Sequence, residues 1–318
     1  MEVGSGDFRY ESVSDWAQLP EGWDFVEVSG VGVDDAKDRV YVFNRGEEPI
    51  IIFNREGRFI DTWEKDMFKR PHGICFGPDD TAYCVDDMGH ALHKRTTDGK
   101  LLMLIETADN PADTGYVPGN FASVRRAGPP FHQPTNVALS PEGNIYVSDG
   151  YGNARIHKFN PKGELILSWG EPGGGPGQFF LPHGVYVDKE GLVYVSDREN
   201  KRVQIFEPDG TFVTQWSDVR RPNQLCQDKD GYFYVAELGF LFQQGGPNPG
   251  FHRPLSRITV RDKLGRILAE IVEEDPYWAP HGLAIDADGN LYAGSVSVSF
   301  TKGTAPKGTV VMRKYVRK

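Results

Sequence analysis

The sequence predicts an all-β protein, a six-bladed β-propeller that forms a single domain over residues 1–318. A pattern of about 40 residues recurs six times, and each copy holds four strand-like runs separated by turn residues such as Pro-Glu-Gly and Asp-Gly. A repeat of that length with four strands is typical of a propeller blade. Helical periodicity is nearly absent, and the 37 glycines suit short strands joined by tight turns.

The clearest copies of the repeat span residues 133–169 and 181–216. Each reads as a proline, a polar residue, an alternating strand, a turn, and an aromatic-Val strand that ends in an acid. The first copy is degenerate, and the last copy lacks its outer strand. The run FRYESVSDW near the N-terminus resembles the missing piece. We therefore expect the N-terminal strand to pair into the last blade and close the ring.

Three segments interrupt the repeat: residues 106–132, 240–253 and 296–306. In a propeller, the connection into an inner strand and the loop after the second strand open on the same face. All three segments are therefore expected to rim one mouth of the central channel. Long loops gathered on one face usually carry function.

Charge and composition exclude several classes of partner. The chain has 35 basic and 45 acidic residues and no Lys/Arg-rich run, so nucleic acid is not an expected partner. No apolar run approaches the ~20 residues of a membrane span, and no membrane association is expected. The expected partner is a small-molecule or short peptidyl substrate, and the sequence leaves protein partners open.

Two further features bear on the compartment. The N-terminus shows neither the basic nor the apolar part of a secretory signal, so a cytoplasmic location is expected, with a secreted mature form as the alternative. Cys75, Cys84 and Cys226 are too few for a disulfide framework. We expect free thiols, although a hairpin could bring Cys75 opposite Cys84.

The polar residue that opens each inner strand is expected near the axis at the mouth with the long loops. In blade order these openers are Ser29, His72, Thr135, His183, Asn223 and His281. Histidine occupies alternate blades, each time within Pro-His-Gly, and alternate positions of a six-fold ring form a triangle. Three nitrogen ligands with a fourth position open are typical of catalytic zinc. The sequence therefore predicts a zinc site formed by His72, His183 and His281.

The remaining histidines fall outside this register and are expected at the surface or in loops: His90, His93, His132, His157 and His252.

The loop after each second strand supplies a second group of candidates. Arg45 and Tyr151 each occur in one copy only, on loops at the predicted mouth, and unusual loop residues suggest a site. Polar residues shared by the two clearest copies are instead expected to fix loops by hydrogen bonds: Asp149, Asn153, Arg155, Asp197, Asn200 and Arg202.

The motifs taken together resemble a known family. In order they read VFNRGEEP, RPHGICF, QPTNVAL, VSDGYGNARI, LPHGVYV, VSDRENKRV and APHGLAI. Over residues 25–318 they resemble the NHL-repeat propeller of peptidyl-α-hydroxyglycine α-amidating lyase, the lyase domain of the peptidylglycine amidating enzymes. The resemblance implies cleavage of an α-hydroxyglycine-type carbinolamide to an amide and glyoxylate. It also implies zinc ligands His72, His183 and His281, a substrate-polarising Arg45 and a catalytic Tyr151.

The chain departs from the family pattern at three positions. Gly282 stands where the family has an aspartate that helps to hold a structural calcium, so calcium is expected to be weak or missing. Ala279 replaces a methionine, and Gly152 replaces a cysteine that forms a disulfide. The changes at Ala279 and Gly282, together with the long segments 106–132 and 240–253, suggest a pocket reshaped away from extended peptides.

Two other functions fit the sequence. A metal-dependent lactonase or other hydrolase on a six-bladed propeller would favour carboxylate and asparagine ligands, for which Asn223 and Glu237 are candidates. A non-enzymatic NHL interaction module would need no metal. Metal content separates this module from both enzymes.

Overall fold

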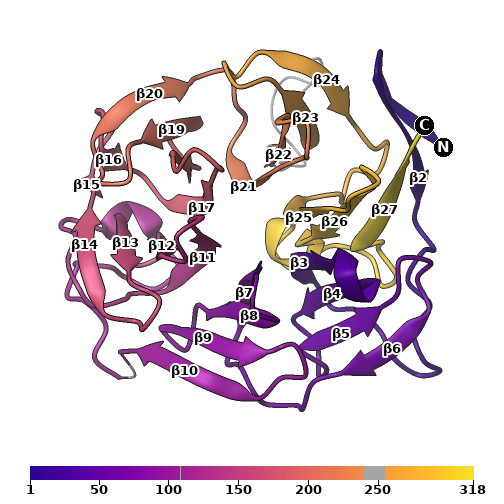
Figure 1. The fold of residues 1–318 in the computed structure, drawn as a ribbon, viewed down its shortest axis with the longest axis horizontal. Coiled ribbons are helices and arrows are strands. Elements are labelled where there is room, and N and C mark those ends of the chain that lie inside the picture. Colours follow the sequence, from indigo (N-terminus) through magenta and orange to yellow (C-terminus); the bar gives the residue numbers. More distant parts are fainter. Residues whose placement is uncertain (108, 240–254) are drawn as a thin grey trace.

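The predicted six-bladed β-propeller is confirmed by a computed structural model, which describes residues 1–107, 109–239 and 255–318. Six main sheets stand around a central axis (Figure 1). The described residues include three short helical segments, η1 (Asp35–Lys37), η2 (Phe121–Ser123) and α1 (Ser297–Phe300). None of the helices in these ranges has the length and apolar character that a membrane span requires.

The first three blades each contain four antiparallel strands, numbered outward from the axis. In chain order they are β3 (Val28–Asp34), β4 (Arg39–Asn44), β5 (Ile50–Phe53), β6 (Phe59–Thr62), β7 (Pro71–Gly77), β8 (Thr81–Asp86), β9 (Ala91–Thr96), β10 (Leu101–Glu106), β11 (Pro134–Leu139), β12 (Ile145–Asp149), β13 (Arg155–Phe159) and β14 (Leu165–Trp169).

The next two blades follow the same plan, and the sixth begins with two strands. They are β17 (Pro182–Val187), β18 (Val193–Asp197), β19 (Arg202–Phe206), β20 (Phe212–Trp216), β21 (Pro222–Gln227), β22 (Phe233–Glu237), β23 (Arg257–Arg261), β24 (Ile267–Ile271), β25 (Pro280–Ile285) and β26 (Leu291–Ser295). Between the third and fourth blades, the short strands β15 (Glu171–Pro172) and β16 (Gln178–Phe179) pair in parallel.

The two ends of the chain close the ring in the sixth blade, as predicted. The last strand, β27 (Met312–Arg317), pairs with β26 and, on its other side, with β2 (Phe8–Val13). The strand β1 (Glu2–Ser5) adds a fifth, outermost strand. Trp16 follows β2 and packs on Phe53 of the first blade and Tyr292 of the sixth. The N-terminal segment therefore joins the first and last blades by both backbone pairing and side-chain packing.

Neighbouring blades pack face to face through buried apolar side chains. Tyr41 and Phe43 of the first blade, for example, share a cluster with Ile74 and Cys84 of the second. Cys84 pairs with Ile74 across the hairpin and not with Cys75, and Cys75, Cys84 and Cys226 are all free. The expectation of free thiols is confirmed.

Candidate active site

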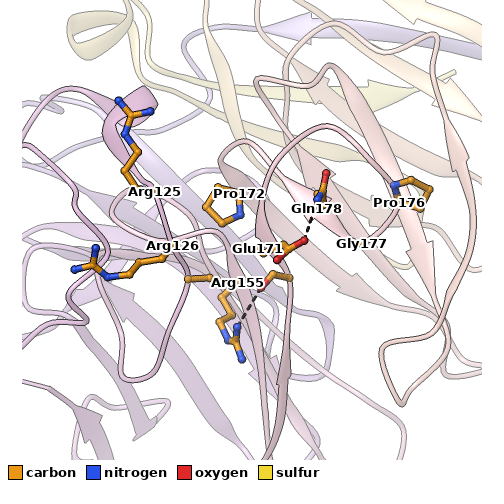
Figure 2. Close-up of a pocket in the computed structure, with 10 residues that line it drawn as sticks. Arg125, Arg126, Arg155, Glu171, Pro172, Pro176, Gly177 and Gln178 are labelled. Atoms are coloured by element: carbon orange, nitrogen blue, oxygen red, sulfur yellow. Dashed lines mark hydrogen bonds between the residues drawn. The ribbon is translucent and has the colours of Figure 1, made fainter.

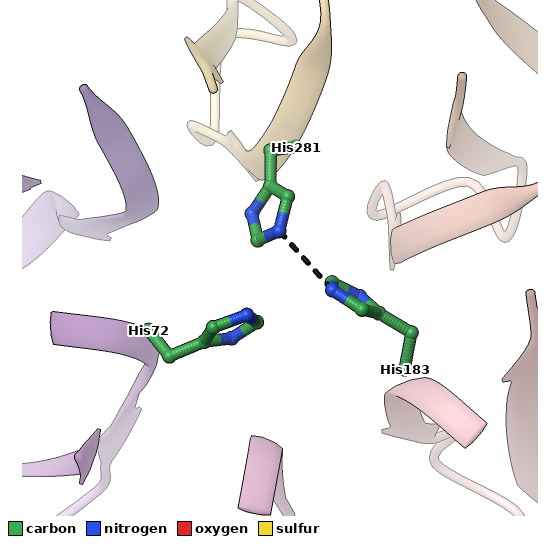
Figure 3. A group of neighbouring side chains, drawn as sticks. All are labelled: His72, His183 and His281. Atoms are coloured by element: carbon green, nitrogen blue, oxygen red, sulfur yellow. Dashed lines mark hydrogen bonds between the residues drawn. The ribbon is translucent and has the colours of Figure 1, made fainter. Parts of the chain in front are cut away.

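The three Pro-His-Gly histidines meet on the axis. His72, His183 and His281 lie at the start of β7, β17 and β25, from three directions around the ring (Figure 3). All three are at most 3% exposed, and one potential ligand atom of each lies within 4.8 Å of the others. The sequence-predicted triangle is therefore present, and this group could hold a metal ion.

A local irregularity turns each opener toward the axis. In all six inner strands, the pairing with the second strand shifts register at the opening residues. Bulges of this kind re-aim a side chain out of the regular pleat. At each opener, the side chain therefore departs from the regular alternation of its strand. The six polar openers together form the inner rim of the ring.

Each histidine is oriented by a backbone carbonyl of the next blade. The Nδ1 atom of His72 lies 2.5 Å from the carbonyl oxygen of Thr135, that of His183 lies 3.0 Å from Asn223, and that of His281 lies 2.6 Å from Ser29. A carbonyl oxygen only accepts, so each Nδ1–H must donate. The unprotonated Nε2 of every ring is then the atom left for a ligand.

The openers of the other three blades complete a ring of hydrogen bonds around the axis, which we call the circuit of openers. Ser29 donates to the carbonyl of Pro71 at 2.9 Å, Thr135 to Pro182 at 3.1 Å, and Asn223 to Pro280 at 2.9 Å. Each of these prolines directly precedes a histidine of the centre. Each non-histidine opener therefore holds the backbone ahead of one histidine through its side chain, and its carbonyl oxygen accepts a hydrogen bond from the Nδ1–H of another.

The glycine of each Pro-His-Gly triplet permits this close contact between blades. A Cβ atom at Gly73 would lie 2.8 Å from the carbonyl oxygen of Thr135, and one at Gly184 would lie 2.3 Å from that of Asn223. At Gly282 it would lie 2.6 Å from Gly30 Cα. The aspartate that the family uses for calcium cannot occupy position 282 without a backbone shift.

The environment keeps the three imidazoles neutral. Burial, followed by repulsion from His281 and His183, holds the pKa of His72 well below its usual value. Burial and Arg198 lower the pKa of His183, while burial and Arg45 lower that of His281 to about 3. Neutral imidazole is the form that ligates metals.

The donor set fits a zinc ion. With every ring proton on Nδ1, the Nε2 atoms of His183 and His281 face each other at 3.2 Å with two lone pairs and no proton between them (Figure 3). A cation at this point would relieve that repulsion. Three imidazole nitrogens suit zinc, and the cluster of described residues includes no carboxylate, the ligand that calcium prefers.

Tyr151 lies directly beside the histidines. It follows β12, and its hydroxyl donates to His72 Nε2 at 2.9 Å and lies 3.3 Å from His183 Nε2. Phe121 of η2 stacks on the phenol ring at 5.3 Å, and the guanidinium groups of Arg70 and Arg198 stand over it at 5.6 and 5.7 Å. The phenol is held in place on several sides with its oxygen at the centre.

Arg45 reaches the mouth from the first blade. It follows β4, and it donates through Nε to the carbonyl of Pro71 and through Nη1 to Glu27 and Ser299. Its Nη2 atom is buried and has no partner among the described residues. A buried donor needs an acceptor, which a ligand at the mouth can supply.

A pocket of about 470 Å³ lies at the mouth, and its lining includes His281, Tyr151 and Arg45. Arg70 pairs with buried Asp87, and Arg198 and Arg221 share Glu199. The segments 106–132 and 296–306 both contribute lining residues, as predicted, and the segment 240–253, with His252, lies outside the described residues.

Sequence reasoning missed several members of this site. Arg70 and Arg221 precede the prolines at openers, in RPHG and RPNQ, and the register that located the histidines could have located them. Glu27, Glu199 and Phe121 carry no such signal. They come from connections that approach the mouth only in the folded ring.

A second hollow, of about 630 Å³, lies between residues 125–127 and the β15–β16 region (Figure 2). Its arginines, Arg125, Arg126 and Arg155, point in different directions (Figure 2). Arg155 donates to the carbonyl of Gly170. The hollow shares no residue with the histidine centre, and we do not assign the chemistry to it.

Some of the histidines outside the centre do not lie where the sequence predicts. The expectation of a surface or loop position is wrong for His93 and His157, which lie in β9 and β13 and are 8% and 2% exposed. Burial of a polar ring is possible there because His93 accepts from Arg95, and His157 bonds Ser168 and Asp149.

The shared polar residues do hold loops. Asp149 accepts from the backbone of His132, and Asn153 donates to Gly128. In the next blade, Arg202 donates to Asp197 and to backbone carbonyls of the connecting loop. Arg155 and Asn200 likewise donate to carbonyls of connecting segments.

Comparison with known proteins agrees with this architecture. The family model described as NHL repeat matches residues 131–159 and 181–206. A gluconolactonase from Xanthomonas campestris has a similar structure, with a TM-score of 0.64 and 13% identity over 98% of this chain and 91% of that one. A streptogramin B lyase has a TM-score of 0.62 and 12% identity over 97% and 98%. At these identities the likeness shows the fold alone. Fold and repeat define an NHL-repeat propeller.

Sequence relatives define the family further. A Caenorhabditis elegans protein described as a probable peptidyl-alpha-hydroxyglycine alpha-amidating lyase is 31% identical, over 79% of this chain and 68% of its own length. NHL repeat-containing protein 3 of Mus musculus is 30% identical, over 77% and 72%. The chain belongs to the family of NHL-repeat propellers that includes these amidating lyases. It spans 31% of the length of another relative, the Mus musculus peptidyl-glycine alpha-amidating monooxygenase, with 28% identity over 91% of this chain.

Proposed function

We propose that the protein is a zinc-dependent lyase that cleaves the C–N bond of an α-hydroxyglycine-type carbinolamide to an amide and glyoxylate. The observation that carries the proposal is one cluster that combines three neutral imidazoles, a phenol and a guanidinium with a free donor. The relatives named as amidating lyases support the same reaction class.

His72, His183 and His281 would hold the ion through Nε2. When bound, zinc supplies a Lewis acid that polarises an oxygen of the substrate. Arg45 can donate through Nη2 to the substrate carboxylate and set its orientation. Phe121 covers one face of Tyr151 and excludes water there.

Tyr151 would move the proton. Its oxygen accepts the proton of the carbinol hydroxyl as its own proton passes to the leaving amide nitrogen. The electron pair of that O–H bond becomes the carbonyl of glyoxylate, the C–N bond breaks, and the amide nitrogen receives a proton. Atoms and electrons balance without water, oxidant or reductant.

The lactonase alternative has weaker support. Glu237 is fully buried and accepts from Thr259, Arg257 and Arg261, so it is not available as a ligand. Asn223 has a buried Oδ1 without a partner but only one such oxygen. A hard cation needs several oxygen ligands.

The two activities are separated by products. The native protein is incubated with N-acetyl-α-hydroxyglycine and with a panel of lactones, before and after chelation and zinc restoration. We expect glyoxylate release that zinc restores. Lactone opening without glyoxylate would replace the lyase by a hydrolase, and a protein inactive on both that carries no metal would indicate the interaction module.

The circuit of openers gives a prediction about metal affinity. Thr135→Val removes the hydroxyl that holds the Pro182 carbonyl while it keeps the side-chain shape. We expect zinc affinity to fall by ~10-fold, because residues that orient ligands typically contribute 10–100-fold. Competition with a chromophoric chelator measures this, and Thr135→Ser should restore most of the affinity. An unchanged dissociation constant for Thr135→Val would show that the circuit does not position the ligands.

Calcium is expected to be absent after dialysis against a chelator. Gly282 provides no carboxylate and has no room for one, because Gly30 and Ser29 lie against it. Elemental analysis of the dialysed protein checks this. About one calcium per chain that survives dialysis would refute it.

A further inference from the structure

The pocket carries more positive charge than a single carboxylate would balance. Five cationic side chains line it among the described residues: Arg45, Arg70, Arg198, Arg221 and Lys302. The described lining includes no carboxylate. Three carboxylates pair with these cations, namely Glu27, Asp87 and Glu199. Two positive charges therefore remain, in a protein whose net charge is −10.

The part of the chain that the structure does not describe adds no acidic residue to offset this imbalance. Residue 108 is alanine, and residues 240–254 read FLFQQGGPNPGFHRP, without aspartate or glutamate. Neither segment can supply a carboxylate to the mouth. The balancing negative charge must come from a ligand or from solvent ions.

One of the two excess charges lies on the side of the mouth opposite Arg45. Arg198 and Arg221 belong to the connections of the fourth and fifth blades, and Arg45 belongs to the first, across the axis (Figure 1). Arg198 Nε and Arg221 Nη2 share Glu199 Oε1 at 2.9 and 2.8 Å, and Arg221 Nε donates to Glu199 Oε2 at 3.1 Å. One carboxylate thus serves two guanidinium groups.

Lys302 adds the second unbalanced charge at the rim. It is exposed, and its ammonium makes no ion pair with a described residue. Apolar residues such as Leu238, Val296 and Phe300 line the same pocket. A short aliphatic chain could cross this surface between the two charged sides.

We propose that the preferred substrate carries a second carboxylate on its acyl part, bound by Arg221 and Lys302. This rests on the proposed function, with the glycine carboxylate at Arg45. Charge-assisted hydrogen bonds from guanidinium to carboxylate are strong and directional, and a cationic pocket in an acidic protein concentrates anions. The substrate class is an N-acyl-α-hydroxyglycine with an acidic acyl group.

Binding is tested first, independently of turnover. Calorimetry on the zinc-loaded protein compares N-succinylglycine, N-succinamoylglycine and N-acetylglycine, which lack the hydroxyl needed for reaction. We expect N-succinylglycine to bind ~10-fold more tightly than the other two, because hydrogen bonds between charged groups are stronger than those between neutral groups. Equal affinities would overturn the proposal.

Turnover and variants complete the test. The kcat/KM ratio of N-succinyl- to N-acetyl-α-hydroxyglycine should be ~10, and Arg221→Gln or Lys302→Gln should lower it toward 1. Lys307→Gln, in the same connection but outside the pocket lining, should keep the native ratio. Turnover with a ratio of 1 would overturn this inference and leave the lyase intact. A binding preference without any turnover would refute the lyase and leave the anion site.

Discussion

Replacing Tyr151 by phenylalanine is expected to lower kcat by ~10²-fold or more, the usual contribution of a general base. The hydroxyl is the only group removed. The phenylalanine ring can still stack on Phe121 and lie under Arg70 and Arg198. Steady-state glyoxylate release, with zinc restored to saturation, measures the effect.

The control for this variant is its metal content. The variant loses the hydroxyl hydrogen bonds to His72 and His183 and can keep the edge-to-face ring contacts with both, so zinc stoichiometry and melting temperature should stay close to those of the native protein. Near-normal turnover of Tyr151→Phe would assign the proton transfer to another group.

Replacing Arg45 by glutamine is expected to lower kcat/KM by ~10²-fold, because a charged hydrogen-bond donor to the substrate carboxylate is lost. The loss should appear mainly in KM if Arg45 binds ground state and transition state alike. Arg45→Lys serves as the matched variant. It retains a cation for Glu27 but not the planar fork, and should recover only part of the activity.

Stability separates the two roles that Arg45 could have. The Arg45→Gln variant leaves Glu27 buried with Ser299 as its remaining partner, so some loss of melting temperature is expected. Arg45→Lys should restore the melting temperature more fully than the activity. Parallel recovery of both would indicate that Arg45 is a structural ion-pair residue.

The repeat made the fold and the histidine centre predictable. A register of six openers places alternate residues on one axis, whatever the detailed packing, so His72, His183 and His281 could be placed together from the sequence. The closing role of residues 8–16 followed from a missing strand in the last copy.

The rest of the site depends on contacts that have no fixed spacing. Glu27 reaches Arg45 from the segment before the first blade, and Ser299 reaches it from the other end of the chain. Phe121 is carried to Tyr151 by an insertion whose path is not set by the repeat. His93 and His157 are buried because their strands provide polar partners, which register alone does not show.

The most direct test of the account is the zinc content of the purified protein beside that of the His72→Ala/His183→Ala/His281→Ala variant, after dialysis against metal-free buffer. Three neutral imidazoles with inward Nε2 atoms predict about one zinc per native chain and none in the variant, since a site with no remaining ligand cannot retain the ion. Circular dichroism of the variant confirms that the propeller is intact. Stoichiometric zinc in the triple variant, or a native protein that binds no zinc when it is supplied, would contradict the account.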